Sequence, residues 1–285
     1  MPRIAYVDGR YLPHGQAAVH VEDRGFQFAD GVYEVIAVRG GRLVDESLHL
    51  ARLARSLGEL RIAPPLGDAA LKIVLRETIR RNGIARGSVY LQVTRGTAPR
   101  DHAFPPVAEP TLVVTARRAR PADPRLAEEG VAVITIADLR WQRCDIKSVS
   151  LLPNVLGKQE ARAAGAFEAW QVDAAGRITE GTSSNAWIVA ADGAVVTHPA
   201  DHAILNGVTR LALIDLIRRA GCRLDERAFT VAEAKAAREA FLTSTTADVV
   251  PVVRIDGAPV GNGHPGLLTQ KLRAAYLAHV AAGAA

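Results

Sequence analysis

Cysteine is scarce in this chain, which has two cysteines among 285 residues. Cys144 and Cys222 lie far apart in the sequence, so they form neither a disulfide framework nor a set of metal ligands. Scarce cysteine fits a reducing compartment, and we expect a cytoplasmic protein. The sequence also lacks any run near the ~20 apolar residues of a membrane span, and residues 1–10 lack the apolar core of a signal peptide. We therefore expect neither a metal nor a membrane as a partner.

Aromatic residues and basic clusters are also few. Phe, Trp and Tyr make up 5% of the chain, and the arginines are dispersed although the net charge is +5. The densest group, Arg117, Arg118 and Arg120, precedes a proline in a stretch that resembles a linker. Binding of nucleic acid needs a basic surface or an aromatic stacking platform. We expect no nucleic-acid partner, since small anionic ligands fit the positive charge as well.

Apolar residues, in contrast, are plentiful: they make up 48% of the chain, enough for the cores of two domains. In the first half, alternating or β-branched runs predict strands, and leucines at helical spacing predict two helices on one side of them. The strands are expected at 4–12 (two strands around the turn Asp8-Gly9), 32–38, 88–94 and 111–116, and the helices at 47–60 and 68–79, the second capped by Asp68. This order predicts an α+β domain over residues 1–117.

A stretch rich in proline and charge at 118–124 is the expected linker. A second domain then covers residues 125–285. Its strands are expected at 131–137, 169–173, 185–189, 241–243 and 249–253, and its helices at about 154–165, 209–220 and 267–280.

Lys147 is the first candidate for chemistry, because it follows an apolar strand and has apolar neighbours. Trp141, Ile146, Val149 and Leu151 could wall a pocket around it. Burial there would lower the pKa of the amine and make it a nucleophile toward carbonyl groups. The alternative is an ordinary surface lysine at the end of a strand.

Three further signals lie in the second half. Val208 and Thr209 stand where a loop becomes a helix, and amide groups at a helix start suit a phosphate; alternatively, Thr209 only caps its helix. Thr245 lies in a run of three hydroxyl residues after a strand, which suits a phosphate or an ordinary turn. Glu180 precedes a loop of small polar residues and could pair with a protonated heterocyclic nitrogen, or be a solvated turn residue.

Together these signals match what pyridoxal phosphate requires. The cofactor needs an amine that forms a Schiff base, a phosphate cup, and a carboxylate facing its pyridine nitrogen. The first half adds Arg100 and His102, which can point the same way from an extended loop and bind a carboxylate; otherwise that loop is simply solvated. Tyr33 could place a phenol in a pocket or be an ordinary strand aromatic.

Over nearly its whole length the chain resembles the class IV aminotransferases of fold type IV, and among them the D-amino acid aminotransferases. The resemblance rests on several motifs in the same order. They are Asp23-Arg24-Gly25-Phe26-Gln27-Phe28-Ala29-Asp30-Gly31-Val32-Tyr33-Glu34-Val35, the loop 95–102, Arg143-Cys144-Asp145-Ile146-Lys147-Ser148, Glu180-Gly181-Thr182-Ser183-Ser184-Asn185 and Ser244-Thr245-Thr246. It implies a smaller N-terminal α/β domain, a larger C-terminal β-barrel-like domain, and pyridoxal 5'-phosphate as cofactor.

The resemblance also implies a role for each candidate. Lys147 would form the Schiff base and move the substrate proton, and Glu180 would keep the pyridine nitrogen protonated. Arg52, Val208, Thr209 and Thr245 would hold the phosphate, although the helical pattern alone places Arg52 on a solvated face. Tyr33, Arg100 and His102 would bind the substrate α-carboxylate, the last two in the site of a neighbouring subunit, which implies a homodimer.

The implied reaction moves the amino group of a D-amino acid such as D-alanine to a 2-oxo acid such as 2-oxoglutarate. Alternatives are an (R)-amine or branched-chain L-amino acid transaminase, an aminodeoxychorismate lyase of the same fold, and a binding protein that has lost catalysis. Ala29 stands where many members of the family carry glycine, a change expected to leave its loop intact.

Overall fold

The computed structural model describes residues 3–120 and 123–284. The chain divides into two compact units. Unit 1 comprises Met1–Pro121, Ile146–Ser150 and Val280–Ala285, and unit 2 comprises Ala122–Asp145 and Leu151–His279. The linker expected at 118–124 includes residues 121 and 122, which lie outside the described residues, so that boundary stays a prediction. The inclusion of Ile146–Ser150 in unit 1 was not expected.

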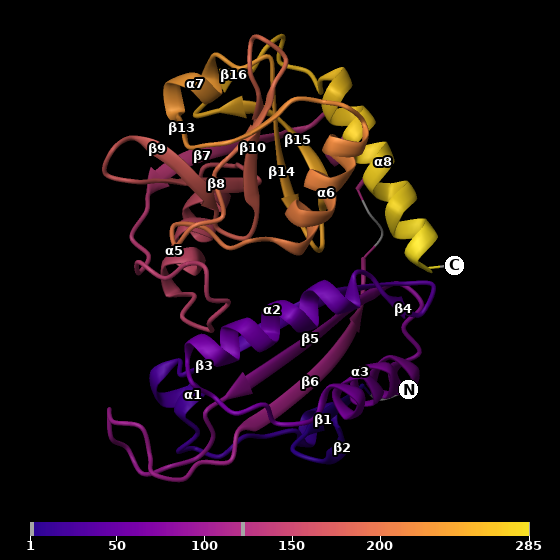
Figure 1. The fold of residues 1–285 in the computed structure, drawn as a ribbon, viewed down its shortest axis with the longest axis vertical. Helices are drawn as coiled ribbons and strands as arrows, with labels where there is room; N and C mark the ends of the chain where they lie inside the picture. Colours follow the sequence, from indigo (N-terminus) through magenta and orange to yellow (C-terminus); the bar gives the residue numbers. More distant parts are fainter. Residues whose placement is uncertain (1–2, 121–122, 285) are drawn as a thin grey trace. The chain divides into compact units, whose positions relative to one another are not determined.

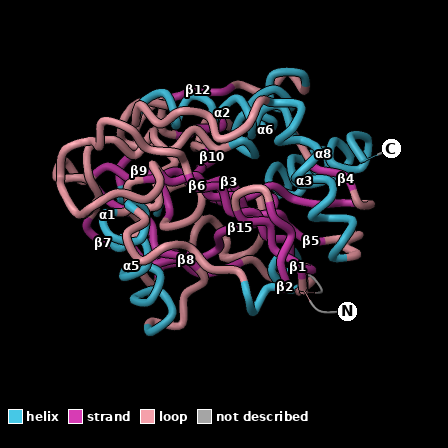
Figure 2. Tube along the Cα trace, turned by 90° about the horizontal axis from the view of Figure 1, so that it is seen from below, coloured by secondary structure: helices cyan, strands magenta, loops and turns pink. Residues whose placement is uncertain are grey.

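Unit 1 contains a six-stranded sheet in the order β2-β1-β6-β5-β3-β4, and every pairing within it is antiparallel over the described residues. Its helices and strands are labelled in Figure 1 and coloured by type in Figure 2. The strands are β1 (Ile4–Val7), β2 (Arg10–Pro13), β3 (Gly31–Arg39), β4 (Arg42–Leu43), β5 (Gly87–Thr94) and β6 (Thr111–Arg118). The helices are α1 (Arg24–Phe28), α2 (Glu46–Glu59) and α3 (Asp68–Asn82), with a 3-10 turn at His14–Gln16.

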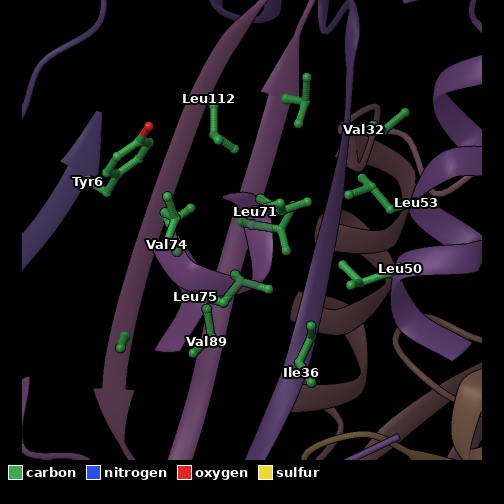
Figure 3. Packing of buried hydrophobic residues seen from close by; sticks show 14 of the residues in the cluster. Tyr6, Val32, Ile36, Leu50, Leu53, Leu71, Val74, Leu75, Val89 and Leu112 are labelled. Carbon is green, nitrogen blue, oxygen red and sulfur yellow. The ribbon is translucent and has the colours of Figure 1, made fainter. Parts of the chain in front are cut away.

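One face of this sheet forms the core of unit 1. Alternate residues of a strand share a face, and the register pairs Val32 with Val93 and Ile36 with Val89. Leucines of α2 and α3 pack on that face, including Leu50 and Leu75 (Figure 3). Burial of each such side chain contributes about 1.5–3 kcal/mol. The prediction of two helices on one side of the strands is confirmed.

Unit 2 contains a ten-stranded mixed sheet in the order β12-β11-β10-β14-β15-β7-β8-β9-β13, with β16 paired to β15. Its strands are β7 (Val131–Ala137), β8 (Glu168–Val172), β9 (Arg177–Gly181), β10 (Asn185–Val189), β11 (Val195–Thr197), β12 (Leu224–Glu226), β13 (Phe229–Thr230), β14 (Glu239–Ser244), β15 (Asp248–Ile255) and β16 (Ala258–Pro259). Its helices are α4 (Arg125–Glu128), α5 (Leu152–Ala163), α6 (Val208–Arg219) and α7 (Val231–Lys235), while α8 (Leu267–Ala284) runs past the end of unit 2.

The sheet of unit 2 curls on itself. β9 and β10 are separated by several strands in the sheet order. They are nevertheless joined by a short loop at 182–184, and the two strands contact each other. Trp170, Ile188 and Phe229 lie in one buried cluster of this unit. The curled sheet confirms the expected barrel-like architecture of the second half.

Several expectations about local structure were wrong in detail. The structure adds α1 and β9, neither of which was expected as a regular element. Asp68 is the first residue of α3 rather than its cap, a place that Gly67 occupies. Ala29 ends α1 in the left-handed conformation (φ 56°), so the chain turns there although the residue is not glycine. Across the residues described, no helix combines the length and apolar character of a membrane span.

Candidate active site

The segment that carries Lys147 adds a short extended stretch beside the start of β3. The backbone N–H of Tyr33 donates to the Lys147 carbonyl at 3.0 Å, and Val149 N–H donates to the Gly31 carbonyl at 3.0 Å. Because side chains alternate along an extended chain, Ile146 enters the core of unit 1 while Lys147 points to the opposite face. The lysine Nζ lies there 4.2 Å from the centroid of the Tyr33 ring.

The expected apolar wall around Lys147 is only partly formed. Ile146 is buried, Val149 and Leu151 are half-buried, and Trp141 is 45% exposed. Lys147 itself is half-buried, so it is not the freely solvated strand-end lysine of the alternative interpretation.

Tyr33 belongs to an aromatic pair on that same face of the sheet. Its ring stacks on Tyr90 with centroids 5.6 Å apart and an angle of 28° between the planes. Burial, aided by the neighbouring Tyr33, raises the pKa of Tyr90 to about 12. The Tyr90 phenol therefore stays protonated at neutral pH, and its hydroxyl donates to the Gln92 side-chain oxygen at 2.5 Å.

Arg52 lies on α2 beside a buried carboxylate rather than on a solvated face. Its Nε and Nη2 donate to the two oxygens of Glu34 at 2.7 and 2.8 Å, and the Arg52 side chain is 9% exposed. His49, one helical turn before Arg52, meets Glu34 through Nδ1 at 2.7 Å. Burial would raise the pKa of Glu34, but the charge and hydrogen bonds of Arg52, with a hydrogen bond from His49, lower it to about 2.

Glu34 and His49 were not among the predicted site residues. A signal was present, since Glu34 interrupts an apolar strand and His49 falls within the apolar stripe of a helix. The sequence pattern could not show that Glu34 pairs with Arg52, because the two residues meet only when α2 packs on β3.

Arg100 and His102 lie on an exposed loop of unit 1, as expected. Both side chains lie against the ring of Phe28: the Arg100 guanidinium carbon is 4.7 Å from its centroid, and the His102 ring centroid is 5.3 Å from it. The two side chains therefore point the same way to the extent that both contact the Phe28 ring.

Glu180 of unit 2 is a buried strand residue, not a solvated turn residue. It lies in β9, is 6% exposed, and accepts hydrogen bonds from the Leu205 backbone N–H and the Asn185 amide, each at 3.1 Å. Arg140 donates a very short hydrogen bond to its other oxygen. The carboxylate is therefore surrounded by donors within its own unit.

Arg140 is held in turn by Asp138. Its Nε and Nη2 donate to the two Asp138 oxygens at 2.9 and 2.7 Å, and Nη2 also approaches the Thr179 hydroxyl at 3.2 Å. Burial would lower the pKa of Arg140, but its bonds to Asp138 and the charge of Glu180 raise it above its ordinary value. Asp138 and Arg140 were also missed, because they lie in an irregular segment after β7.

The start of α6 lies near this carboxylate. Asn185, which holds Glu180, has its Oδ1 only 2.2 Å from where a side chain on Gly207 would begin, so a larger residue there would displace Asn185. Gly207 is the N-cap of α6 and makes no side-chain cap hydrogen bond. Thr209 therefore does not cap its helix; its hydroxyl lies 3.3 Å from the Tyr276 hydroxyl. The backbone N–H groups of the first turn have no capping side chain.

The hydroxyl run around Thr245 forms the hairpin between β14 and β15, where Ser244 Oγ accepts from Ala247 N–H. Its register places it at the same end of the sheet as the loop after Glu180, because Asn185 pairs with Thr243. The loop after Glu180 is fixed by a buried carboxylate, Glu168. This carboxylate accepts hydrogen bonds from the loop hydroxyls of Thr182, Ser183 and Ser184.

The predicted residues thus fall into two groups. Unit 1 holds Lys147 with Tyr33, Arg52 with Glu34, and Arg100 with His102; unit 2 gathers Glu180, the start of α6 and the Thr245 hairpin. No cluster of metal-ligating side chains occurs within the ranges 3–120 and 123–284.

Known proteins similar to this chain share one family. The model of the amino-transferase class IV family matches residues 31–255. The chain is 45% identical over 269 residues to a D-alanine aminotransferase of Bacillus licheniformis, with 94% of each chain covered. It is 40% identical over 273 residues to a D-alanine aminotransferase of Staphylococcus haemolyticus, with 95% of each covered.

Solved structures agree with this result. A branched-chain aminotransferase of Thermoproteus uzoniensis with norvaline superposes with a TM-score of 0.86 at 27% identity, covering 97% of this chain and 94% of that one. A 4-amino-4-deoxychorismate lyase of Pseudomonas aeruginosa superposes with a TM-score of 0.82 at 30% identity, covering 95% and 97%. The two-domain fold expected from the resemblance is confirmed, and the chain belongs to the class IV aminotransferases.

Proposed function

We propose that this aminotransferase uses pyridoxal 5'-phosphate to move the amino group of D-alanine and other D-amino acids to a 2-oxo acid such as 2-oxoglutarate. The observation that carries the reaction is 45% identity to a D-alanine aminotransferase over 94% of both chains. Branched-chain enzymes match the fold at lower identity, 27% for the Thermoproteus uzoniensis enzyme. The D-amino acid reaction is therefore favoured over the branched-chain alternative.

The side chains of both units fit the chemical groups of this cofactor. A half-buried amine suits its aldehyde, and a buried carboxylate suits a protonated ring nitrogen. An uncapped helix start with a glycine at the N-cap suits its phosphate. No group in this set is chemically mismatched to the cofactor.

Each residue would then bind one part of the cofactor. Lys147 would hold the aldehyde carbon through its amine, and Glu180 would accept a hydrogen bond from the ring nitrogen and keep it protonated. Val208 and Thr209 would donate backbone N–H groups to the phosphate, with Thr245 adding its hydroxyl. Arg52 would add a positive charge, its guanidinium oriented by the fork that it makes with Glu34.

When bound, pyridoxal phosphate supplies an electron sink that stabilises the negative charge left on the substrate α-carbon. Lys147 would accept the α-proton as the base. Tyr33, Arg100 and His102 would bind the α-carboxylate and so orient that proton. Tyr90, which stays protonated, adds no negative charge beside Tyr33.

Replacement of Lys147 tests the assignment. Lys147→Ala should lose the absorption of the lysine-bound cofactor and at least about 10³-fold of the transamination rate, since it removes both the attachment and the base. Lys72→Ala is the matched control, because Lys72 pairs with Asp68 on the surface of α3. A Lys147→Ala enzyme that converts D-alanine and 2-oxoglutarate at the parent rate would refute the proposal.

Two assays separate the alternatives. Initial rates with D-alanine and L-alanine, each with 2-oxoglutarate, distinguish a D-specific enzyme from a branched-chain-like one. Arg100→Leu should abolish D-alanine activity if Arg100 binds the carboxylate, whereas an amine transaminase would be indifferent. Protein that stays colourless after incubation with pyridoxal phosphate would indicate a chain without catalysis.

We also propose a cytoplasmic homodimer. Its support is the exposed loop of Arg100 and His102, which the family resemblance assigns to a neighbouring subunit's site, and two cysteines that are free. Sedimentation equilibrium that gives the mass of a single 30.4 kDa chain would contradict the dimer.

A further inference from the structure

Arg24, a residue with no role in the proposed reaction, is buried at the base of the Arg100 loop. It is 3% exposed, although it stands in a five-residue helix at the edge of unit 1. Its Nη1 donates to the Asp101 carbonyl at 2.6 Å, and its Nη2 approaches the His102 carbonyl at 3.4 Å. One guanidinium thus binds the carbonyl groups of two consecutive residues, Asp101 and His102, which directly follow Arg100.

A second buried arginine strengthens this attachment through Asp30. Arg24 Nε donates to Asp30 at 2.8 Å, and Arg95 donates to both oxygens of the same carboxylate at 2.7 and 2.9 Å. Burial would raise the pKa of Asp30, but hydrogen bonds from Arg95 and Arg24 lower it. Arg95 also donates to the carbonyls of Leu60 and Arg61, so the network ties the loop to the end of α2.

Phe28 supplies the surface on which the functional side chains lie. The guanidinium carbons of Arg100 and Arg24 are 4.7 and 4.9 Å from its ring centroid, and the His102 ring lies 5.3 Å away. Cation–π contacts of this kind fix the plane and direction of an arginine. The ring therefore restricts the orientation of Arg100 and His102 together.

The base of the loop is joined to α1 by one side-chain and one backbone hydrogen bond. Asp23 caps α1 and also accepts a hydrogen bond from the Thr94 hydroxyl at 2.7 Å, and Arg24 N–H donates to the Gly96 carbonyl at 2.9 Å. From residue 99 to 109 the loop has no regular secondary structure and is mostly exposed. Such a segment depends on side-chain anchors for a defined conformation.

We propose that Arg24 and Phe28 are positioning residues for recognition of the substrate carboxylate: Arg24 fixes the backbone of the loop, and Phe28 fixes the side chains of Arg100 and His102. The inference rests on the proposed function, because it assigns Arg100 and His102 to the carboxylate. It implies that changes in α1 weaken the binding of substrates that have a carboxylate and leave the binding of a substrate without one unchanged.

Phe28→Leu is the main test, since leucine retains the apolar bulk and removes the ring. In the holoenzyme, KM for D-alanine and for 2-oxoglutarate should rise roughly fivefold to tenfold, with kcat changed by less than about twofold. The half-reaction with a carboxylate-free (R)-amine and the cofactor absorption should not change. Phe26→Leu is the matched control on the same helix, because the Phe26 ring is 74% exposed.

Arg24→Lys supplies a second variant with a readout that does not depend on activity. Lysine keeps a charge beside Asp30 but cannot bind Asp30 and two carbonyls together. Hydrogen exchange of the holoenzyme should be faster at the amides of residues 99–104 in both variants and unchanged in Phe26→Leu. Unchanged exchange in both Arg24→Lys and Phe28→Leu would overturn the anchoring.

The Arg100→Leu assay distinguishes failure of this inference from failure of the proposed function. If Arg100→Leu loses D-alanine activity while Phe28→Leu and Arg24→Lys keep the parent KM, the positioning role is wrong and the carboxylate assignment stands. If Arg100→Leu is itself indifferent, the carboxylate assignment fails, and the positioning role fails with it. A rise in the amine KM equal to that for D-alanine would also overturn the inference, because it indicates general damage.

Discussion

Each unit contains a buried arginine bound to a buried carboxylate, but the proposed roles of the two charges are reversed. In unit 1 the cation, Arg52, is assigned to the ligand, and the fully buried Glu34 is its partner. In unit 2 the anion, Glu180, is assigned to the ligand, and Arg140 is its partner. In the proposed function, the two networks would supply opposite charges to the cofactor.

This reversal changes what the buried partner must do. An arginine is always charged in proteins, so Glu34 need only orient Arg52, which its two-point contact does. A buried carboxylate can instead be neutralised by a proton. Arg140 therefore stabilises the ionised form of Glu180 as well as orienting it. Arg140 also pairs with two carboxylates, Asp138 and Glu180, so its removal should cost more than removal of a partner in unit 1.

Arg140→Met should have the largest effect. It leaves two carboxylates, Asp138 and Glu180, close together without their cation, and loss of one partner of a buried ion pair costs about 3–5 kcal/mol. Urea unfolding of the holoenzyme at neutral pH measures this free energy. Arg177→Met is the control, because the Arg177 side chain is 52% exposed and its surface pair with Asp173 contributes at most about 1 kcal/mol. Equal losses in the two variants would contradict the comparison.

Glu34 should make the stability of unit 1 depend on acid. Its pKa is about 2 in the folded protein against an ordinary 4.5, so its contribution is complete above pH 4.5 and is lost as pH falls toward 2. The shift corresponds to a contribution on the order of 3 kcal/mol. Glu34→Gln should lower the unfolding free energy at pH 7 and flatten its decline between pH 4.5 and 2, as followed by urea unfolding at a series of pH values.

Glu77 provides the control for this acid dependence. Its pKa is also lowered to about 2, by hydrogen bonds from Arg80 and Arg81, but these arginines are 72% and 41% exposed. Solvent screens such a surface pair. Glu77→Gln should leave the pH dependence nearly unchanged, and a flattening as large as that of Glu34→Gln would show that burial is not the cause.

The sequence predicted most of what depends on short-range periodicity. The strand at Val131–Ala137 matches its expected bounds, and α2 and α3 lie where leucine spacing placed them. β9 was missed because Arg-Ile-Thr-Glu-Gly has little apolar alternation and is buried only where the sheet curls. α1 has five residues, too few for a helical period, although Asp23 was a possible capping signal.

In the candidate site, too, local sequence features could be predicted and contacts between distant residues could not. Lys147, Glu180 and the start of α6 could be singled out by chemistry and position, but the charges that hold them could not. Arg140 reaches Glu180 across 40 residues of sequence, and Arg24 reaches Asp101 across 77. Trp141 was expected beside the lysine on sequence proximity and is instead exposed. Pairings of this kind depend on how the elements pack, which local patterns do not contain.

His49 should have the smallest effect of the residues in these networks. Burial lowers its pKa although the hydrogen bond to Glu34 opposes this, so a neutral imidazole donates to Glu34 at pH 7. His49→Gln keeps an amide donor in place and should cost about 1 kcal/mol of unfolding free energy at pH 7.5. Because the unfolded imidazole binds a proton first, the parent loses stability as pH falls below 6.5, and the variant should lack that loss. His14→Gln, at an exposed histidine of the same unit, should change neither quantity. If His49→Gln costs as much as Arg140→Met, Glu34 depends on its histidine rather than on the Arg52 fork, and the contrast between the two networks fails.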